Sequence, residues 1–547
     1  MATDTSDQRN YIDKLPVELK CTVVRYLALK DRQSASLLNR DWAVVVIPIM
    51  WETFTSDLLI KTGPRKALAL GDPASNIVKH VRKIHLLDRA NASNEGDQLP
   101  QLLVTIPRDQ LCGFKSGKGV TISTLELLLR MHTKLYEFDV SGAEFSLILQ
   151  SPWTSASLSD LAHTTVVVDA LTPQDVQKLW TRCPKLKHIR MVRKPISSFI
   201  STAATLLESH FGDDATIAAS EGGAADLTRS DTAILQLISL YIGDLILPVT
   251  FSTMFQRIDI IALTELVLVG TARVAELLEA MCSDFQNREP SLKKLRLSKM
   301  SELESNDTTS QLQLFLLSFH GLRQLHFECS NCIKIAIDGI INHGETLADL
   351  LVVNGGIHRQ NATKCMSAED LRKVAIACPN LEQLCLNLYE IDPDTPEGDF
   401  LSPKSAILSE STEFENALSA IASMKTLRLL RLTNPPNYRK AYHRQGEFMR
   451  FFRRSLESGE QRYAFQARAD SIMRYMGDRQ SNTRLLAFSP MESLTKAASA
   501  DKNGHIWPNY FYTCERMKGI RGTEISIARA VRDWKTEIPE ATILNEG

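Results

Sequence analysis

The chain of 547 residues is 44% hydrophobic and carries 63 basic and 64 acidic side chains, so its formal net charge is −1. A balance this even gives no electrostatic reason for the whole chain to bind nucleic acid or an anionic membrane. The start, MATDTSDQRN, lacks the apolar run of a secretory signal. The longest apolar stretch, 233–251, contains Asp244 and Pro248 and is too interrupted to span a bilayer. We therefore expect a cytoplasmic or nuclear protein in which 233–251 forms a buried helix followed by a strand.

Ten cysteines are scattered along the chain. This distribution is not typical of a disulfide framework, so reduced and mostly buried thiols are expected. The length suggests three or four domains unless a repeat array makes one long body.

Three consecutive short helices are predicted within residues 15–51. Pro16 suits the first helical position, where its missing N–H costs nothing. Apolar residues then recur every four positions and predict an amphipathic helix; they are Leu19, Val23 and Leu27. Caps for the second and third helices are expected at Asp31 and Asn39. Three short helices have too much surface to bury every apolar side chain, so part of that surface should contact a partner.

The order and spacing of these residues resemble the F-box. The matching residues are Leu15, Pro16, Glu18, Leu19, Val23, Leu27, Asp31, Leu37, Leu38, Trp42, Pro48 and Trp51. The resemblance implies that residues 11–55 dock onto a Skp-type adaptor, which joins cullin and RING subunits of a ubiquitin ligase, and that the chain uses no cofactor and catalyses nothing. The residues implied to contact or support the adaptor are Leu15, Pro16, Leu19, Val23, Leu27, Trp42, Pro48 and Trp51.

One departure from the F-box pattern is Arg32-Gln33, which occupies positions that are usually apolar in the family. It implies a shorter second helix or a weaker adaptor contact. The alternative interpretation of residues 15–51 is a three-helix cap that merely starts the larger domain.

Beyond a helical joint expected at 52–67, a short phrase recurs: apolar, two residues, apolar, one residue, apolar. Its last two apolar residues would lie on one face of a strand, so each phrase adds one strand. Phrases from position 263 start 29, 30, 25, 34 and 46 residues apart, and the shorter intervals fit leucine-rich repeats. The phrases lie at Val81/Ile84/Leu86, Leu135/Phe138/Val140, Leu186/Ile189/Met191, Leu263/Leu266/Leu268, Leu292/Leu295/Leu297, Leu322/Leu325/Phe327, Leu347/Leu350/Val352, Leu381/Leu384/Leu386 and Leu427/Leu430/Leu432.

Helical spacing of apolar residues fills several intervals between the phrases. Helices are expected at 271–287, 311–319, 367–378 and 414–424. The sequence Cys378-Pro379-Asn380-Leu381 resembles the cysteine-containing leucine-rich repeat that often follows an F-box. The expected fold is therefore α/β, with a three-helix unit at 11–55, an irregular leucine-rich-repeat solenoid at 56–435 and a helical cap within 436–547.

The predicted array is irregular. Loops are expected at 88–100, 212–230 and 387–415, because these stretches are polar or rich in proline. The phrase is absent between positions 191 and 263, which leaves either two degenerate repeats or an insertion.

The C-terminal region is expected to hold a long basic helix at 446–476 that covers the open end of the array, then a strand at 485–489 and an aromatic segment at 505–513. The stretch 390–415 has a net charge of −7 and the stretch 428–484 a net charge of +8. The basic residues are either a solvated helix face, a site for an acidic or phosphorylated protein segment, or a nucleic-acid site, the last being disfavoured. The residues of this candidate substrate site are Arg450, Arg453, Arg454, Arg462 and Arg468.

Two near matches to known sites are rejected. Residues 113–119, GFKSGKG, are one residue short of a phosphate loop and lack the hydroxyl that follows its lysine. The pair Cys329 and Cys332 has no second pair and no histidine at ligand spacing, so no metal is expected. We expect a substrate-recognition adaptor of a ubiquitin ligase; the alternative is a repeat scaffold that binds its partner without a ligase, and an enzyme comes third.

Overall fold

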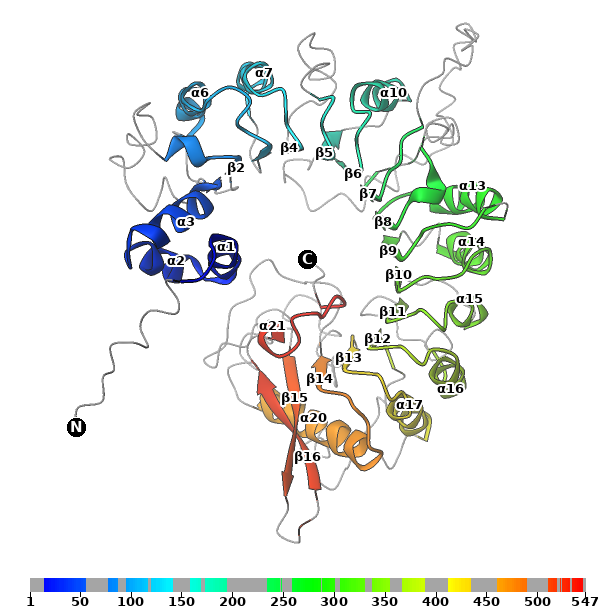
Figure 1. Ribbon diagram of the computed structural model, residues 1–547. Coiled ribbons are helices and arrows are strands. Elements are labelled where there is room, and N and C mark those ends of the chain that lie inside the picture. The colour runs from blue at the N-terminus through cyan, green and yellow to red at the C-terminus, as the bar shows by residue number, and fades with distance from the viewer. Residues whose placement is uncertain are drawn as a thin grey trace, which may run out of the picture. The chain divides into compact units, whose positions relative to one another are not determined.

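The structure is a computed structural model. It describes residues 14–55, 77–86, 95–116, 120–140, 158–168, 173–193, 234–245, 247, 258–286, 288–300, 305–329, 337–354, 366–388, 412–433, 460–488, 510–518, 522, 524–531 and 534–544. The chain divides into two compact units, Met1–Leu237 with Pro248–Asp259 and Ile238–Leu247 with Ile260–Gly547. Both are mixed α/β, with strands stacked side by side in chain order (Figure 1). No helix in the described ranges is long and apolar enough to cross a bilayer.

The first unit starts with three helices, hereafter the head: α1 (Val17–Tyr26), α2 (Leu29–Ser36) and α3 (Arg40–Trp51). Parallel strands follow, with helices between several of them. These elements are β1 (Thr53–Thr55), η2 (Val78–His80), β2 (Lys83–Leu86), α6 (Glu95–Thr105), β3 (Gly113–Ser116), α7 (Ile122–Met131), β4 (Glu137–Val140), β5 (His163–Val168), α10 (Pro173–Arg182) and β6 (His188–Arg193). One register row across these strands is buried: Phe54, Ile84, Phe114, Phe138, Thr164 and Ile189.

The second unit also consists of parallel strands with helices between them, but its last two strands are antiparallel. Its elements are β7 (Ser239–Gly243), η3 (Ile260–Ala262), β8 (Glu265–Val269), α13 (Val274–Phe285), β9 (Lys294–Met300), α14 (Ser305–Leu317), β10 (Gln324–Cys329), α15 (Ile337–Ile341), β11 (Asp349–Asn354), α16 (Ala368–Ala377), β12 (Gln383–Leu386), α17 (Thr412–Ala422), β13 (Leu429–Leu432), α20 (Glu460–Asp478), β14 (Leu485–Phe488), β15 (Tyr510–Lys518), β16 (Glu524–Val531) and α21 (Trp534–Glu537). Strands β7 to β14 are parallel, whereas β15 and β16 pair antiparallel.

The leucines of the repeat phrase form the core of each unit. A buried register row in the second unit consists of Leu240, Leu266, Leu295, Leu325, Leu350, Leu384, Leu430 and Leu486. Because alternate residues of a strand point to opposite faces, these leucines lie on one face and the residues between them on the other. This other face, here termed the inner face, points away from helices α13 to α17 (Figure 1). The prediction that each phrase marks a strand is confirmed at all nine positions.

Four strands depart from the expectations. Residues 53–55, predicted as part of a helical joint, form β1, and 113–116 form β3. The strand β5 was hidden because Thr164 takes the place of a leucine; its buried hydroxyl donates to the Phe138 carbonyl at 2.8 Å. The predicted buried helix within 233–251 is wrong in its described part, which contains an isolated bridge at Leu235 and the strand β7.

The helix predictions hold better than the loop predictions. Helices α13, α14, α16 and α17 confirm the four expected between the phrases, although α14 begins earlier than predicted. The predicted loop at 88–100 is wrong for 95–100, which belong to α6. The predicted loop at 387–415 is wrong for 412–415, which begin α17, and residues 389–411 lie outside the described ranges. The loop at 212–230 and residues 446–459 of the predicted basic helix also lie outside them.

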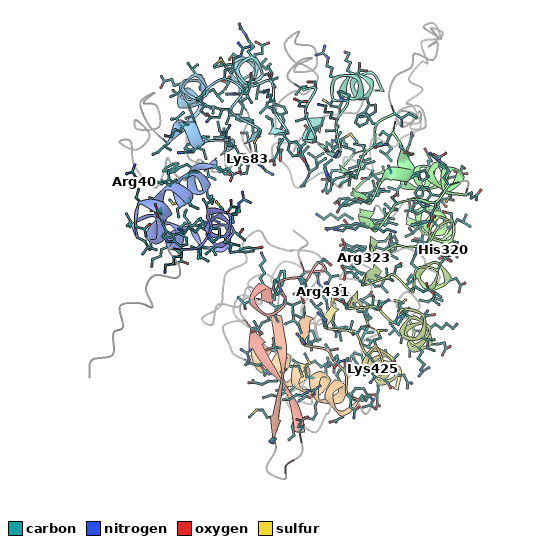
Figure 2. The ribbon with its side chains drawn as sticks, in the orientation of Figure 1. Arg40, Lys83, His320, Arg323, Lys425 and Arg431 are labelled. Carbon is teal, nitrogen blue, oxygen red and sulfur yellow. The ribbon has the colours of Figure 1, made fainter. Side chains whose placement is uncertain are left out.

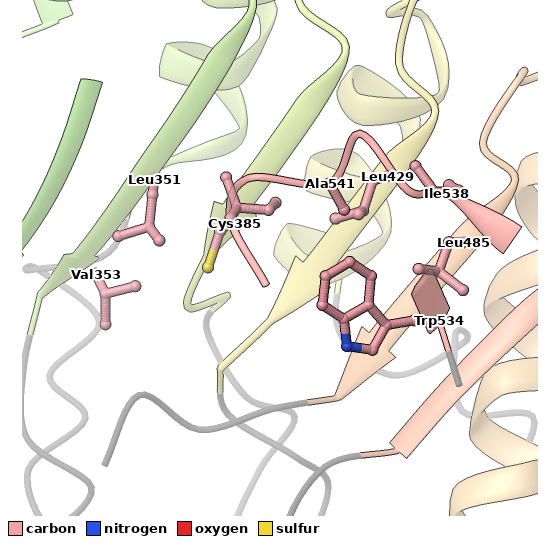
Figure 3. Packing of buried hydrophobic residues seen from close by; sticks show 9 residues of the cluster. Leu351, Val353, Cys385, Leu429, Leu485, Trp534, Ile538 and Ala541 are labelled. Atoms are coloured by element: carbon pink, nitrogen blue, oxygen red, sulfur yellow. The ribbon is translucent and has the colours of Figure 1, made fainter. Parts of the chain in front are cut away.

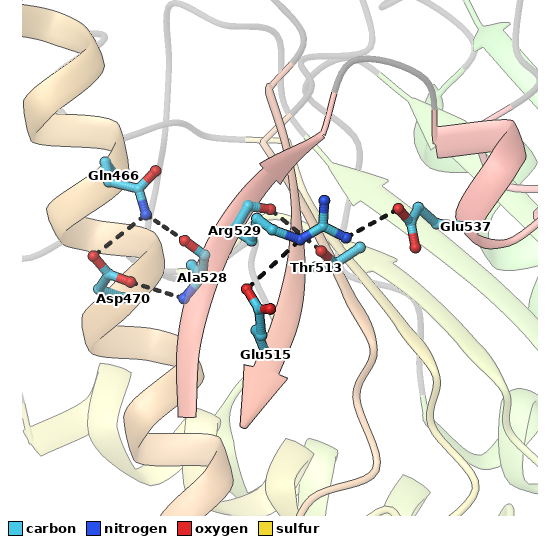
Figure 4. Close-up of polar contacts among 7 residues, drawn as sticks. All are labelled: Gln466, Asp470, Thr513, Glu515, Ala528, Arg529 and Glu537. Carbon is cyan, nitrogen blue, oxygen red and sulfur yellow. Dashed lines mark hydrogen bonds and ion pairs between the residues drawn. The ribbon is translucent and has the colours of Figure 1, made fainter. Parts of the chain in front are cut away.

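The last strand is covered by α20 (Figure 4). The Gln466 side chain donates to the Ala528 carbonyl, and the Asp470 carboxylate accepts from the Ala528 N–H at 2.8 Å. Side chains of a helix thus bind main-chain groups of β16 that another strand would otherwise pair with.

Candidate functional site

The head has a small core of its own. Side chains from all three helices are buried together: Val24, Ala35, Trp42, Val45 and Val46. The ammonium of Lys20 lies 5.6 Å from the centroid of the Trp42 ring, and the Lys20 stem is buried against it. The three helices are therefore packed on one another and form a defined unit.

Polar groups fix the ends of the head helices. The Asn39 side chain accepts from the Trp42 N–H at 2.9 Å and caps α3, as predicted. Asp31 is not the cap of α2, because that helix begins at Leu29 and Asp31 lies in its first turn. The Arg32 guanidinium donates to the Val24 carbonyl at 2.9 Å and to the Arg25 carbonyl at 2.7 Å. An arginine at this position therefore satisfies the C-terminal carbonyls of α1.

The surface of the head is unusually apolar. Among the described residues, nine of the seventeen exposed large apolar side chains belong to the head, and eight are spread over the rest. Leu37 is 86% exposed and Leu19 is 52% exposed. A concentration of exposed apolar side chains favours a protein-binding role. The nine are Val17, Leu19, Val23, Tyr26, Leu29, Leu37, Leu38, Val44 and Ile47.

The structure sorts the predicted adaptor-contacting residues into three groups. Pro16, Leu19 and Val23 are exposed. Trp42 is 3% exposed and belongs to the core, so it supports the surface and does not form part of it. The others are half-buried: Leu15, Leu27, Pro48 and Trp51. The predicted site did not include Leu37 and Leu38, which are exposed. The sequence signal for them was two adjacent leucines directly after a short polar helix.

The candidate substrate arginines do not form an exposed set in the described chain. Arg468 is buried, and its guanidinium lies 4.6 Å from the centroid of the Phe414 ring. Its role is packing between α20 and α17, which corrects its assignment to a solvent-facing site. Arg450, Arg453 and Arg454 lie outside the described residues, and so does the side chain of Arg462.

The inner face of the first unit is lined by paired polar side chains. Lys83 bridges to Glu137 at 3.0 Å, across the strand that carries Gly113. The missing side chain of Gly113 makes this possible, because a Cβ there would lie 3.1 Å from Lys83 Cγ. Figure 2 shows Lys83 on this side of the strands. The hydrogen bond to Glu137, together with the charge of that carboxylate, raises the pKa of Lys83 above its ordinary value.

A histidine pair continues this face. The rings of His163 and His188 stack with centroids 4.2 Å apart, and His163 Nε2 is 2.8 Å from the Tyr136 hydroxyl. Burial, followed by the neighbouring His188, lowers the pKa of His163. The His163 ring is therefore neutral more readily than a free imidazole.

The inner face of β11 to β14 carries an apolar cluster that is covered. Leu351 and Val353 of β11, Cys385 of β12, Leu429 of β13 and Leu485 of β14 point to this face. Residues from the end of the chain pack on them (Figure 3): Trp534, Ile538, Ala541 and Ile543. The C-terminal segment therefore occupies a surface formed by four successive strands.

The near matches to chemical sites remain unsupported. Gly113–Ser116, the start of the incomplete phosphate loop, forms strand β3. No cluster of His, Cys, Asp and Glu suited to a metal occurs in the described ranges. Burial raises the pKa of Cys183 to about 12 and that of Cys378 to about 11, so neither thiol is a nucleophile at neutral pH.

No protein-family model matches the chain, and no curated protein matches it. The functional argument therefore depends on the chain's own residues, and the apolar surface of the head is the feature with the clearest chemical meaning.

Proposed function

We propose that the chain is the substrate-recognition subunit of a Skp/cullin/F-box type ubiquitin ligase, with the head as an F-box and the strand-and-helix array as leucine-rich repeats. The observation that carries the proposal is the concentration of exposed apolar side chains on a head that already has its own core. The resemblance of residues 15–51 to the F-box indicates a Skp-type adaptor as the partner.

The exposed side chains are sufficient for a stable contact. Burying a leucine completely contributes about 1.5–3 kcal/mol, and Leu37 and Leu38 are largely exposed. Five such residues, fully buried, would contribute up to about 15 kcal/mol, whereas a micromolar complex needs about 8 kcal/mol beyond an association cost of at least about 4 kcal/mol. Arg32 supports this surface, because it fixes α2 against the end of α1.

The proposed mechanism is effective concentration. A chain that binds the ligase through its head and a target through its repeats makes ubiquitin transfer nearly intramolecular, without catalytic residues of its own. The inner face of the strands is the proposed target side.

The test is reconstitution with a purified Skp-type adaptor. The intact chain should co-elute with the adaptor in gel filtration, and Leu19→Asp combined with Leu37→Asp should weaken binding at least about 100-fold, because two carboxylates would be buried in the contact. Ile376→Asp is the matched control, since Ile376 is 83% exposed in the second unit. Its affinity for the adaptor should equal that of the parent.

Failure of the intact, folded chain to bind the adaptor would overturn the ligase proposal. A repeat scaffold that binds a partner without a ligase would then be the better description.

A further inference from the structure

The C-terminal segment Ile538–Ile543 is held as a bound peptide is held. Its apolar anchors Ile538, Ala541 and Ile543 are buried on the inner face, while Pro539 and Glu540 between them are exposed. The first, fourth and sixth residues of the segment thus face the strands. Between the first two anchors the segment turns, with the Ala541 N–H donating to the Ile538 carbonyl at 3.1 Å. A bound peptide likewise presents some residues to pockets and others to solvent.

Side chains of the strands bind the main chain of this segment. The Gln383 amide accepts from the Thr542 N–H at 2.9 Å and donates to the Glu540 carbonyl at 3.2 Å. The Arg431 guanidinium donates to the Ile543 carbonyl, and Figure 2 shows Arg431 at this face. Bonds to the main chain do not depend on the side chains of the bound segment, so another segment could form them equally well.

One contact is specific for a side chain of the segment, that of Thr542. The Thr542 hydroxyl donates to the Asp349 carboxylate at 2.7 Å, and the same carboxylate oxygen accepts from the Gln324 amide. Asp349 is buried beneath the segment. A phosphate on this hydroxyl would place two anions together where water cannot screen them.

The sheet does not need the segment for its own hydrogen bonds. Strands β11 to β14 pair with one another through an unbroken register, and no strand pairing in the described ranges involves Ile538–Ile543. The ion pair between Arg428 and Glu540, at 3.6 Å, lies at the rim with both side chains about half exposed, and such a pair adds little. The segment can therefore leave without breaking the ladder beneath it.

We propose that the inner face of β11 to β14 is a peptide-binding surface. Its ligand is a segment of a target protein that turns between its first and fourth positions, with apolar residues at its first, fourth and sixth positions and an unphosphorylated threonine or serine at its fifth. The chain's own Ile538–Ile543 occupies this surface and competes with the target. Only the statement that the target becomes ubiquitylated rests on the proposed function; the binding itself does not.

The experiment uses the full chain with a specific protease site in place of residues 532–533. The protein folds intact and is then cleaved, which frees residues 534–547 from the covalent chain. The probe is a fluorescein-labelled synthetic peptide of residues 534–547, and its binding is followed by anisotropy, with circular dichroism as the check of the fold. After dialysis the cleaved chain should bind the probe at least about tenfold more tightly than the uncleaved chain, because it has lost its competitor.

Four variants sharpen the test. Gln383→Ala in the cleaved chain should weaken binding of the probe at least about tenfold, since three main-chain hydrogen bonds, to Glu540, Thr542 and Ile543, are lost. The matched control Arg428→Ala should change affinity less than about threefold. A probe with Thr542→Val should bind about tenfold more weakly, and a probe with phosphothreonine at position 542 at least about 100-fold more weakly.

The proposal fails if the cleaved fragment stays bound and does not exchange with the probe. It fails equally if the chain unfolds once the fragment leaves, because the segment would then be part of the fold, or if the phosphorylated probe binds as tightly as the plain one. The adaptor test changes Leu19 and Leu37 in the other unit, so the two proposals can fail separately.

Discussion

His343 should make the second unit sensitive to mild acid. It lies after α15, is almost fully buried, and its Nδ1 accepts from the Leu322 N–H at 3.4 Å. Burial, followed by the nearby His320, lowers its pKa from 6.5 to about 4. Between these values the unfolded chain binds a proton that the folded chain does not, so the free energy of unfolding falls as the pH decreases.

The magnitude follows from the two pKa values. At pH 7.5 the ring is neutral in both states and contributes no difference. At pH 5.5 the unfolded ring is mostly protonated, and the folded state loses about 1 kcal/mol; below pH 4 the loss approaches about 3 kcal/mol. Urea unfolding followed by circular dichroism at pH 7.5 and 5.5 measures this difference.

The informative variant is His343→Asn, which retains a polar acceptor near the Leu322 N–H but does not titrate. The variant should be less stable at both pH values because the asparagine side chain is smaller than that of histidine. Between pH 7.5 and 5.5, however, its free energy of unfolding should fall by about 1 kcal/mol less than that of the parent. His320→Asn is the control for removing an exposed imidazole; because His320 is the smaller cause of the lowered His343 pKa, this variant should reduce the pH dependence much less than His343→Asn does. An undiminished pH dependence in His343→Asn would refute the reasoning.

Two further predictions concern single contacts. Arg32→Ala should lower the stability of the head by about 1 kcal/mol, because the Val24 and Arg25 carbonyls lose their donor. Thermal unfolding measures this change, with Gln33→Ala, at the exposed neighbouring position, as the control. Equal unfolding midpoints for the two variants would contradict the prediction. Gly344→Ala should lower the free energy of unfolding by about 2–3 kcal/mol, because the added Cβ would lie 2.1 Å from the Ala377 carbonyl oxygen. Gly522→Ala has open space and only a left-handed φ of 76°, so its expected cost is about 1 kcal/mol; a larger loss in Gly522→Ala than in Gly344→Ala would show that backbone conformation outweighs the clash.

Strands were predictable wherever burial on the helix-covered face required three apolar residues at fixed spacing. Prediction failed where a polar or small residue was buried at one of these three positions. Thr164 is buried because its hydroxyl bonds a neighbouring carbonyl, and Ser116 ends β3 as a small buried residue. The expectation that the phrase is absent between positions 191 and 263 is wrong, because Leu237, Leu240 and Ile242 match it and lie at β7. The continuous apolar run around them does not distinguish a strand from a buried helix.

The candidate surface was only partly predictable. The spacing of Leu19 and Val23 indicated an apolar face of α1, but whether such a face packs inward or remains exposed depends on the other helices. Trp42 is the largest apolar residue of the head core, whereas Leu37 projects outward. The contact of Thr542 with Asp349 joins positions 193 residues apart, and no local pattern encodes it.

The helix that lies along β16 also limits assembly. A stack of parallel strands has a natural tendency to grow, because its terminal edge offers main-chain donors and acceptors to a strand from any other molecule. Gln466 and Asp470 occupy those groups at Ala528, so a second copy finds no free template at this point. The same two side chains that finish the fold thereby help to keep it from becoming the seed of a fibre.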